Sequence, residues 1–132
     1  MPKPDLKLLL ERAKEAALGA YAPYSGYHVG AAIMTGEGEI FTGANIENAS
    51  YSLTICAERT ALFTAINQGK RDFVGIGIYV DSEENFPPCG ACRQVLAEFA
   101  PNLPIIYGNR LSSTETDLAK LLPGAFNLKK NR

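Results

Sequence analysis

The chain has 132 residues, which suits one domain and is long enough to bury a hydrophobic core without disulfide bridges. Its 13 basic and 14 acidic side chains give a net charge of −1, so it lacks the basic excess typical of nucleic-acid-binding proteins. No stretch approaches the ~18 consecutive apolar residues of a membrane span. We therefore expect a single domain over residues 1–132, with no nucleic-acid and no membrane partner.

The cysteine content bears on the compartment and on the chemistry. The first residues, Met1-Pro2-Lys3-Pro4-Asp5, lack the apolar run of a signal peptide. We therefore expect a cytoplasmic protein, in which thiols stay reduced. The three cysteines are Cys56, Cys89 and Cys92. An odd number of cysteines in a reducing compartment argues against a disulfide framework and favours a metal-binding or catalytic use.

Hydrophobic spacing predicts alternating helices and strands. Apolar residues three and four positions apart indicate helices, and short apolar runs bounded by turn residues indicate strands. In chain order we expect a helix from Leu6 to about Ala20, strands from Tyr27 to Met34 and from about Ile40 to Asn45, an irregular segment from Asn48 to Ile55, a helix from about Ala57 to Gln68, a strand from Val74 to Val80, a helix from roughly Gly90 to Phe99, a strand from Leu103 to Tyr107 and a short helix from about Thr116 to Leu122. This order implies an α/β fold, with a mixed sheet and helices on its faces.

The cysteines stand at the starts of two predicted helices. Cys56 directly precedes one helix, while Cys89 and Cys92 form a C-x-x-C pair that opens another. Because both groups follow loops, their thiolates can converge where the two helix N-termini meet and hold one tetrahedral zinc ion. The positive ends of the helix dipoles also favour the thiolate forms.

A C-x-x-C pair is also found in redox sites and in structural zinc sites. A thioredoxin-like redox pair would leave Cys56 and Glu58 without a role. A structural zinc site normally has four protein ligands. The chain has no fourth cysteine, and its only histidine, His28, falls on a predicted strand away from both clusters. Three protein ligands and an open fourth position are typical of a catalytic zinc ion.

Charged residues next to the cysteines support that interpretation. Glu58 follows Cys56 by two positions. A glutamate on a first helical turn is usually solvated, but beside an open zinc ion it can serve as the base that a metal-bound water requires. Three thiolates give the zinc centre a net negative charge, which Arg59 is well placed to offset by hydrogen bonding to sulfur. Arg93 is a weaker candidate, and we expect it to be a solvated surface residue.

The order of these residues matches a known signature. Cys56-Ala57-Glu58 followed by Pro88-Cys89-Gly90-Ala91-Cys92 is the zinc deaminase signature in its three-cysteine form. The chain resembles the homotetrameric zinc-dependent cytidine deaminase family along nearly its whole length. The other matching segments are Tyr21-Ala22-Pro23-Tyr24-Ser25, Val29-Gly30-Ala31-Ala32, Asn45-Ile46-Glu47-Asn48, Arg59-Thr60-Ala61-Leu62, Arg93-Gln94 and Leu121-Leu122-Pro123-Gly124-Ala125-Phe126.

The resemblance implies a fold and a reaction. The fold is a three-layer α/β/α arrangement around a five-stranded mixed sheet. The reaction is the hydrolytic deamination of cytidine and deoxycytidine to uridine and deoxyuridine plus ammonia, a step of pyrimidine salvage. One Zn²⁺ per subunit, held by Cys56, Cys89 and Cys92, activates the water, and Glu58 shuttles the protons.

The resemblance also implies substrate contacts. Asn45 and Glu47 should hydrogen-bond the ribose 3′-hydroxyl, and Ala57 should contact substrate as well. Tyr27 takes the place of an aromatic residue, commonly phenylalanine, that lines the base pocket. Whether its extra hydroxyl meets substrate or solvent stays open at this point.

Two further residues imply an assembly. Tyr51 and Phe126 match residues that the family presents across a subunit boundary, near the 5′-hydroxyl and against the base. We therefore expect a homotetramer with active sites shared between subunits. The alternatives are a deaminase of a blasticidin-type antibiotic, a polynucleotide cytosine deaminase and a non-catalytic zinc-stabilised binding domain. The N-x-E segment and the aromatic near the C-terminus favour the nucleoside.

Overall fold

A five-stranded mixed sheet forms the centre of the fold. The computed structural model describes residues 4–84, 86–126 and 128. Met1, Pro2 and Lys3, on which part of the signal-peptide argument rests, lie outside the described residues. The strands are β1 (Val29–Thr35), β2 (Ile40–Ala44), β3 (Phe73–Val80), β4 (Pro104–Gly108) and β5 (Ser113–Asp117). Their order is β2-β1-β3-β4-β5, and β3 and β4 are parallel while the other neighbours are antiparallel.

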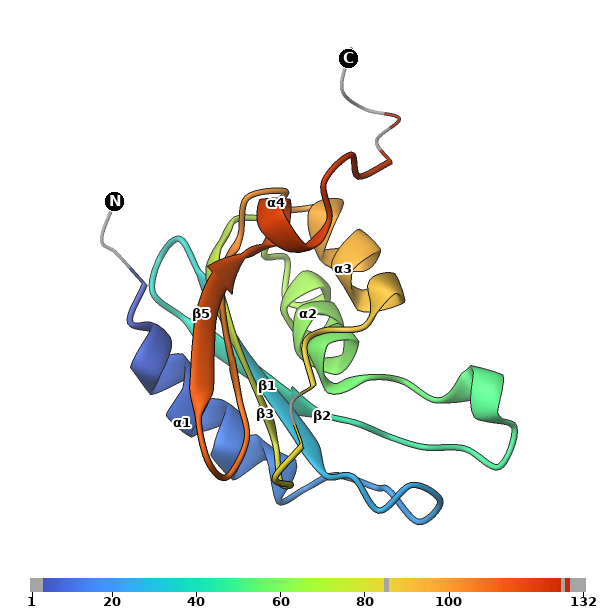
Figure 1. Ribbon diagram of the computed structural model, residues 1–132. Coiled ribbons are helices and arrows are strands. Elements are labelled where there is room, and N and C mark those ends of the chain that lie inside the picture. The colour runs from blue at the N-terminus through green and yellow to red at the C-terminus, as the bar shows by residue number, and fades with distance from the viewer. Residues whose placement is uncertain (1–3, 85, 127, 129–132) are drawn as a thin grey trace.

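Helices cover both faces of this sheet (Figure 1). They are α1 (Leu6–Ala17), α2 (Ala57–Asn67), α3 (Gly90–Ala97) and α4 (Leu118–Leu121), together with the 3₁₀ helix η1 (Tyr51–Leu53). Helix α1 packs on one face, and α2 and α3 pack on the other. The predicted three-layer α/β/α fold with a five-stranded mixed sheet is therefore confirmed.

The central strand β3 explains why two separate cores form. Its sequence FVGIGIYV is apolar throughout, and all but one of its residues are buried, as expected for a strand covered on both faces. Ile76 and Ile78 face a core shared with α2 and α3. Tyr79 faces the second core, which α1 forms with Leu9 and Ala13. The sheet is thus fixed between its helices from both sides.

Glycines allow the helices to lie directly on the sheet backbone. A Cβ atom on Gly30 of β1 would lie 1.9 Å from the carbonyl oxygen of Ala13 in α1, and one on Gly77 of β3 would lie 2.6 Å from the carbonyl carbon of Leu9. On the other face, a Cβ on Gly43 of β2 would lie 2.5 Å from the backbone nitrogen of Ala61 in α2. Close packing of these helices therefore requires the absence of a side chain at these positions.

The chain near residue 116 differs from its sequence prediction. The helix expected from Thr116 to Leu122 was wrong at its start, because Ser113–Asp117 forms β5 and α4 spans only Leu118–Leu121. The polar, threonine-containing run offers no apolar helix face, whereas it can pair with β4 along the sheet edge. Asp117 then caps α4 by accepting a 2.9 Å hydrogen bond from the backbone N–H of Lys120.

Two other boundaries affect the site. The first strand begins at Val29 rather than Tyr27, so Tyr27 and His28 lie in the loop before β1. The segment between β2 and α2, expected to be irregular, contains η1 and projects away from the sheet (Figure 1).

Within the described residues, no helix combines the length and apolar character needed to cross a membrane.

Replacing Gly30 with alanine tests the close approach of α1. We expect Gly30→Ala to lower the free energy of unfolding by about 3 kcal/mol or more, at the upper end of overpacking costs, because the added methyl group meets backbone. Gly19→Ala is the control, since its Cβ would be 3.6 Å from the nearest of its neighbours, the carbonyl oxygen of Ala16. Denaturant unfolding at equal protein concentrations measures both. Equal stability of the two variants would contradict the packing argument.

Candidate metal centre and active site

Three thiols meet where α2 and α3 begin. Cys56 is the N-cap residue of α2 and Cys89 is the N-cap residue of α3, with Cys92 in the first turn of α3. The Cys89 sulfur accepts a 3.3 Å hydrogen bond from the backbone N–H of Cys92, so the pair also stabilises the helix start. The Sγ atoms of Cys56, Cys89 and Cys92 all lie within 4.8 Å of one another.

The sulfur positions fit a zinc ion. Zn–S bonds of about 2.3 Å at tetrahedral angles place the sulfurs about 3.8 Å apart. The Cys56 and Cys89 sulfurs are 3.8 Å apart, and those of Cys89 and Cys92 are 3.1 Å apart. All three cysteines are free thiols. Cys89 is exposed, Cys56 is half-buried and Cys92 is buried. The cluster can therefore hold zinc through three sulfurs.

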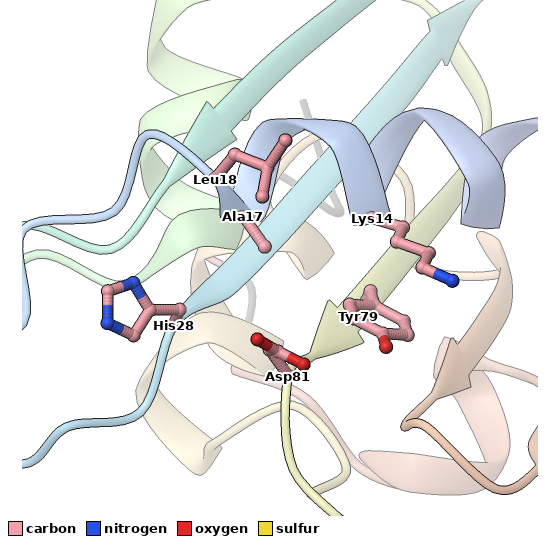
Figure 2. A pocket seen from close by; sticks show the side chains of 6 residues that line it. All are labelled: Lys14, Ala17, Leu18, His28, Tyr79 and Asp81. Carbon is pink, nitrogen blue, oxygen red and sulfur yellow. The ribbon is translucent and has the colours of Figure 1, made fainter.

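His28 lies elsewhere, as Figure 2 shows. Its side chain borders a surface hollow of about 360 Å³ on the α1 face of the sheet, together with Lys14, Tyr79 and Asp81. Among the described residues, the only group of three or more possible metal ligands is the cysteine cluster. The described residues thus offer three ligands, the cysteine sulfurs, to a metal ion.

Hydrogen bonds set the charge of the cluster. The Cys92 thiol, followed by Arg59 and Cys89, lowers the pKa of Cys56 to about 5. Nη2 of Arg59 lies 3.6 Å from the Cys56 sulfur and 3.4 Å from the carbonyl oxygen of Thr54. Its Nε is buried and has no hydrogen-bond partner within the part of the chain that the structure describes. Arg59 therefore has donor capacity left beside a group of sulfurs that carries negative charge.

Glu58 is buried beside the thiols. It lies on the first turn of α2, and only 5% of its surface is exposed. Burial raises its pKa to about 7, and the neighbouring Cys56 thiolate acts in the same direction. An ordinary surface glutamate ionises near pH 4.3. Glu58 is therefore a carboxyl group that can both accept and donate a proton close to neutral pH.

One pocket of about 280 Å³ brings the predicted residues together. Its lining includes the predicted residues Tyr27, Asn45, Glu47, Tyr51, Cys56, Ala57, Glu58 and Cys89. Sequence reasoning did not single out Ser25, Val29, Thr54, Ile78, Phe86 and Pro87, which also line it. Ser25 belongs to a matching segment and carries that signal. Val29 likewise begins a matching segment, whereas Thr54, Ile78, Phe86 and Pro87 are apolar or loop residues without any sequence signal for a site.

Asn45 and Glu47 support the pocket through the backbone. Oδ1 of Asn45 accepts from the N–H of Val29 at 2.9 Å, and Nδ2 donates to the carbonyl of Tyr27 at 2.8 Å. Glu47 accepts from the Ser25 hydroxyl and from the backbone N–H groups of Tyr24 and Ser25, at 2.9 and 3.0 Å. These bonds, with the Ser25 hydroxyl first, lower the pKa of Glu47. Asn45 retains a second N–H and Glu47 further lone pairs for a ligand.

Phe126 and Arg93 lie outside this pocket. Phe126 is 69% exposed and borders a separate hollow near α4. The expectation that Arg93 is a solvated surface residue was wrong. Its Nε donates to the carbonyl of Pro88 at 2.7 Å and its Nη1 to that of Leu121 at 2.8 Å. Arg93 thus ties the start of α3 to the end of α4.

Comparison with known proteins agrees with this geometry. Residues 3–107 match the family described as the cytidine and deoxycytidylate deaminase zinc-binding region. The chain belongs to this family. It is 50% identical over 124 residues to a cytidine deaminase of Halalkalibacterium halodurans, covering 92% of this chain and 94% of that one. It is 47% identical over 125 residues to the cytidine deaminase of Sporosarcina psychrophila, covering 93% and 92%.

A solved structure shares the fold. The crystal structure of cytidine deaminase from Burkholderia pseudomallei matches with a TM-score of 0.87 at 46% identity. The match covers 91% of this chain and 98% of that chain. Since the family is defined by its zinc-binding region, the cluster of Cys56, Cys89 and Cys92 is the part of this chain that holds the metal.

Thiol titration tests the metal centre. We expect the purified protein to hold one zinc ion per chain and its three cysteines to resist a thiol reagent, because all of them are ligands. Chelation should make exposed Cys89 and half-buried Cys56 reactive, and zinc should protect them again. Cys89→Ser should release the metal. Equal thiol reactivity with and without zinc would contradict this ligand set.

Proposed function

We propose that this protein hydrolyses the 4-amino group of free cytidine and deoxycytidine, releasing ammonia and the uridine nucleosides. The observation that carries the proposal is the pocket in which Glu58 lies beside Cys56 and Cys89. Free thiols as metal ligands suit the reducing cytoplasm, where pyrimidine salvage takes place.

The chemistry requires one base that moves several protons. A zinc ion held by the three thiolates supplies a Lewis acid that makes water a nucleophile at neutral pH. Glu58 takes a proton from the attacking water and delivers it to N3 of the cytosine ring. It then takes the proton of the hydroxyl group now on C4 and delivers it to the 4-amino nitrogen. The C4–N bond breaks as the C4 carbonyl forms, so that water and cytidine give uridine and ammonia. The burial of Glu58 near the thiols supports this role.

The rest of the pocket suits a nucleoside. We assign Asn45 and Glu47 to the ribose 3′-hydroxyl, because each retains hydrogen-bonding capacity and both are held rigidly by the backbone. Tyr27 and Ala57 contact the base. The apolar lining by Val29 and Ile78 also suits the flat ring of a pyrimidine.

The decisive test is turnover of cytidine by the zinc-loaded protein, followed as a loss of near-ultraviolet absorbance. We expect Glu58→Gln to keep the fold and the zinc but to lose ~10²–10⁴-fold in turnover, since it removes the proton carrier. Glu37→Gln is the matched control, because Glu37 is exposed at the turn between β1 and β2. Turnover of blasticidin S or of a cytosine-containing oligonucleotide, but not of cytidine, would overturn the proposal.

Arg59 has a supporting role in the proposal. Its guanidinium lies against the Cys56 sulfur and offsets the negative charge of the thiolates. In Arg59→Gln that charge is stronger, so the attacking water loses its proton less readily. We expect the pH at which activity rises to move upward, and Arg59→Lys to move it less. An unchanged pH–rate profile in Arg59→Gln would contradict this role.

We also propose a homotetramer with shared active sites. The segment between β2 and α2 exposes large apolar groups that a single chain leaves uncovered, with Tyr51 73% and Leu53 64% exposed. Near the C-terminus, Nε2 of Gln94 donates to the carbonyl of Phe126 at 3.0 Å, and the Phe126 N–H donates back to Oε1 of Gln94 at 3.4 Å. The backbone is thus held while the ring stays exposed. We assign Phe126 to stacking on the base held by a neighbouring subunit, and Tyr51 to the 5′-hydroxyl there.

Subunit mixing tests the sharing. Base–aromatic stacking is worth ~1–3 kcal/mol, so Phe126→Ala should lower catalytic efficiency roughly five- to a hundredfold. Glu58→Gln and Phe126→Ala chains, unfolded together and refolded with zinc, should exceed the mean activity of the two refolded alone. Some sites then combine an intact Glu58 with a neighbour's intact Phe126. If mixed oligomers form but their activity only averages the parents, each site belongs to one chain.

A further inference from the structure

The side chain of Tyr27 contacts two residues of the segment between β3 and α3. Its hydroxyl donates a 2.8 Å hydrogen bond to Oε1 of Glu84. Its ring packs edge to face against Phe86, with the ring centroids 4.9 Å apart and the planes at 85°. The hydroxyl therefore donates its proton to a protein partner.

Both rings also line the pocket that contains Glu58. The segment supplies Phe86 and Pro87 to its wall, together with the metal ligand Cys89. An edge-to-face aromatic pair is stabilising beyond its buried area, but its geometry depends on both backbones staying in place. A hydrogen bond that holds the loop of Tyr27 to the segment of Phe86 would therefore affect the shape of the pocket wall.

Other bonds hold the segment at either end. Nδ2 of Asn109, in the turn between β4 and β5, donates to the carbonyls of Glu83 and Glu84 at 3.2 and 2.9 Å. The Ser82 hydroxyl accepts from the backbone N–H of Glu84 at 3.1 Å. Further on, Arg93 holds the carbonyl of Pro88. Phe86 lies between these fixed points, and Tyr27 contacts it there.

We propose that the Tyr27 hydroxyl, through Glu84, positions Phe86 as a wall of the substrate pocket and so sets the affinity for substrate. The inference rests on the proposed function for the identity of that substrate. Tyr27 is then a positioning residue as well as a lining residue. The Glu84 carboxylate, by accepting this hydrogen bond, raises the pKa of Tyr27, so the hydroxyl stays protonated and donating at neutral pH.

The kinetics of conservative variants test the role of the Tyr27–Glu84 hydrogen bond. We expect Tyr27→Phe and Glu84→Ala each to raise KM for cytidine roughly three- to tenfold, the range of one hydrogen bond. The effect should fall more on KM than on turnover, because neither change touches the proton carrier. Glu84→Gln keeps an acceptor oxygen and should recover most of the affinity. Glu83→Ala removes the same charge from the neighbouring residue, and its KM should match that of the wild type.

A variant without the Phe86 ring tests whether the Tyr27 hydroxyl acts through that ring. If the hydroxyl acts through Phe86, adding Tyr27→Phe to Phe86→Ala should not raise KM any further. The double variant Tyr27→Phe/Glu84→Ala should likewise resemble either single variant. A wild-type KM in Tyr27→Phe overturns the proposal, as does a Tyr27→Phe effect that persists in full without Phe86.

A fluorescence probe separates this inference from the proposed function. The chain contains no tryptophan, so Phe86→Trp places a single indole in the wall. We expect Tyr27→Phe or Glu84→Ala, added to Phe86→Trp, to increase quenching of that tryptophan by acrylamide, whereas Glu83→Ala does not. Unchanged quenching would overturn the positioning role. Because quenching needs no turnover, a protein that proves inactive on cytidine would refute only the proposed function.

Discussion

The convergence of two helix N-termini on three thiols is the constraint on which the site depends. Cys56 and Cys89 are the N-cap residues of α2 and α3, so the same residues begin the helices and provide sulfur. Thiolates this close repel one another unless a cation lies between them. The helix dipoles and Arg59 reduce that repulsion, and a metal dication removes it. Part of the metal-binding free energy is therefore available to hold α2 against α3.

The sheet and its glycines make that convergence precise. Gly30 and Gly77 let α1 lie on the backbone of one face, and Gly43 lets α2 do the same on the other. A close-packed layer leaves little freedom to slide. The N-terminus of α2 is thus fixed relative to β1 and β2, whose ends carry residues of the pocket. A catalytic geometry that must hold within a fraction of an ångström requires such a scaffold.

The loops around the pocket are held by side chains that also face it. Asn45 bonds to the backbone on both sides of His28, and Glu47 holds the loop of Tyr24 and Ser25. Tyr27 holds Glu84 and packs on Phe86. Mutation of any of these residues changes the shape of the pocket as well as a direct contact. Matched controls and KM measurements are needed to separate the two effects.

The sequence by itself determined the metal ligands, the α/β class, and the main helices and strands. Helical periodicity, the C-x-x-C pair and the order of Cys56 and Glu58 are local signals, readable within a few residues. Only the tertiary structure decided that Ser113–Asp117 is a strand, because its partner β4 supplies the hydrogen bonds that its polar sequence does not predict. Phe86 and Ile78 likewise reach the pocket from separate segments, and the Tyr27–Glu84 hydrogen bond forms beside it. Such contacts depend on how β1, β3 and the loop before α3 are placed in space, which no short stretch of sequence encodes.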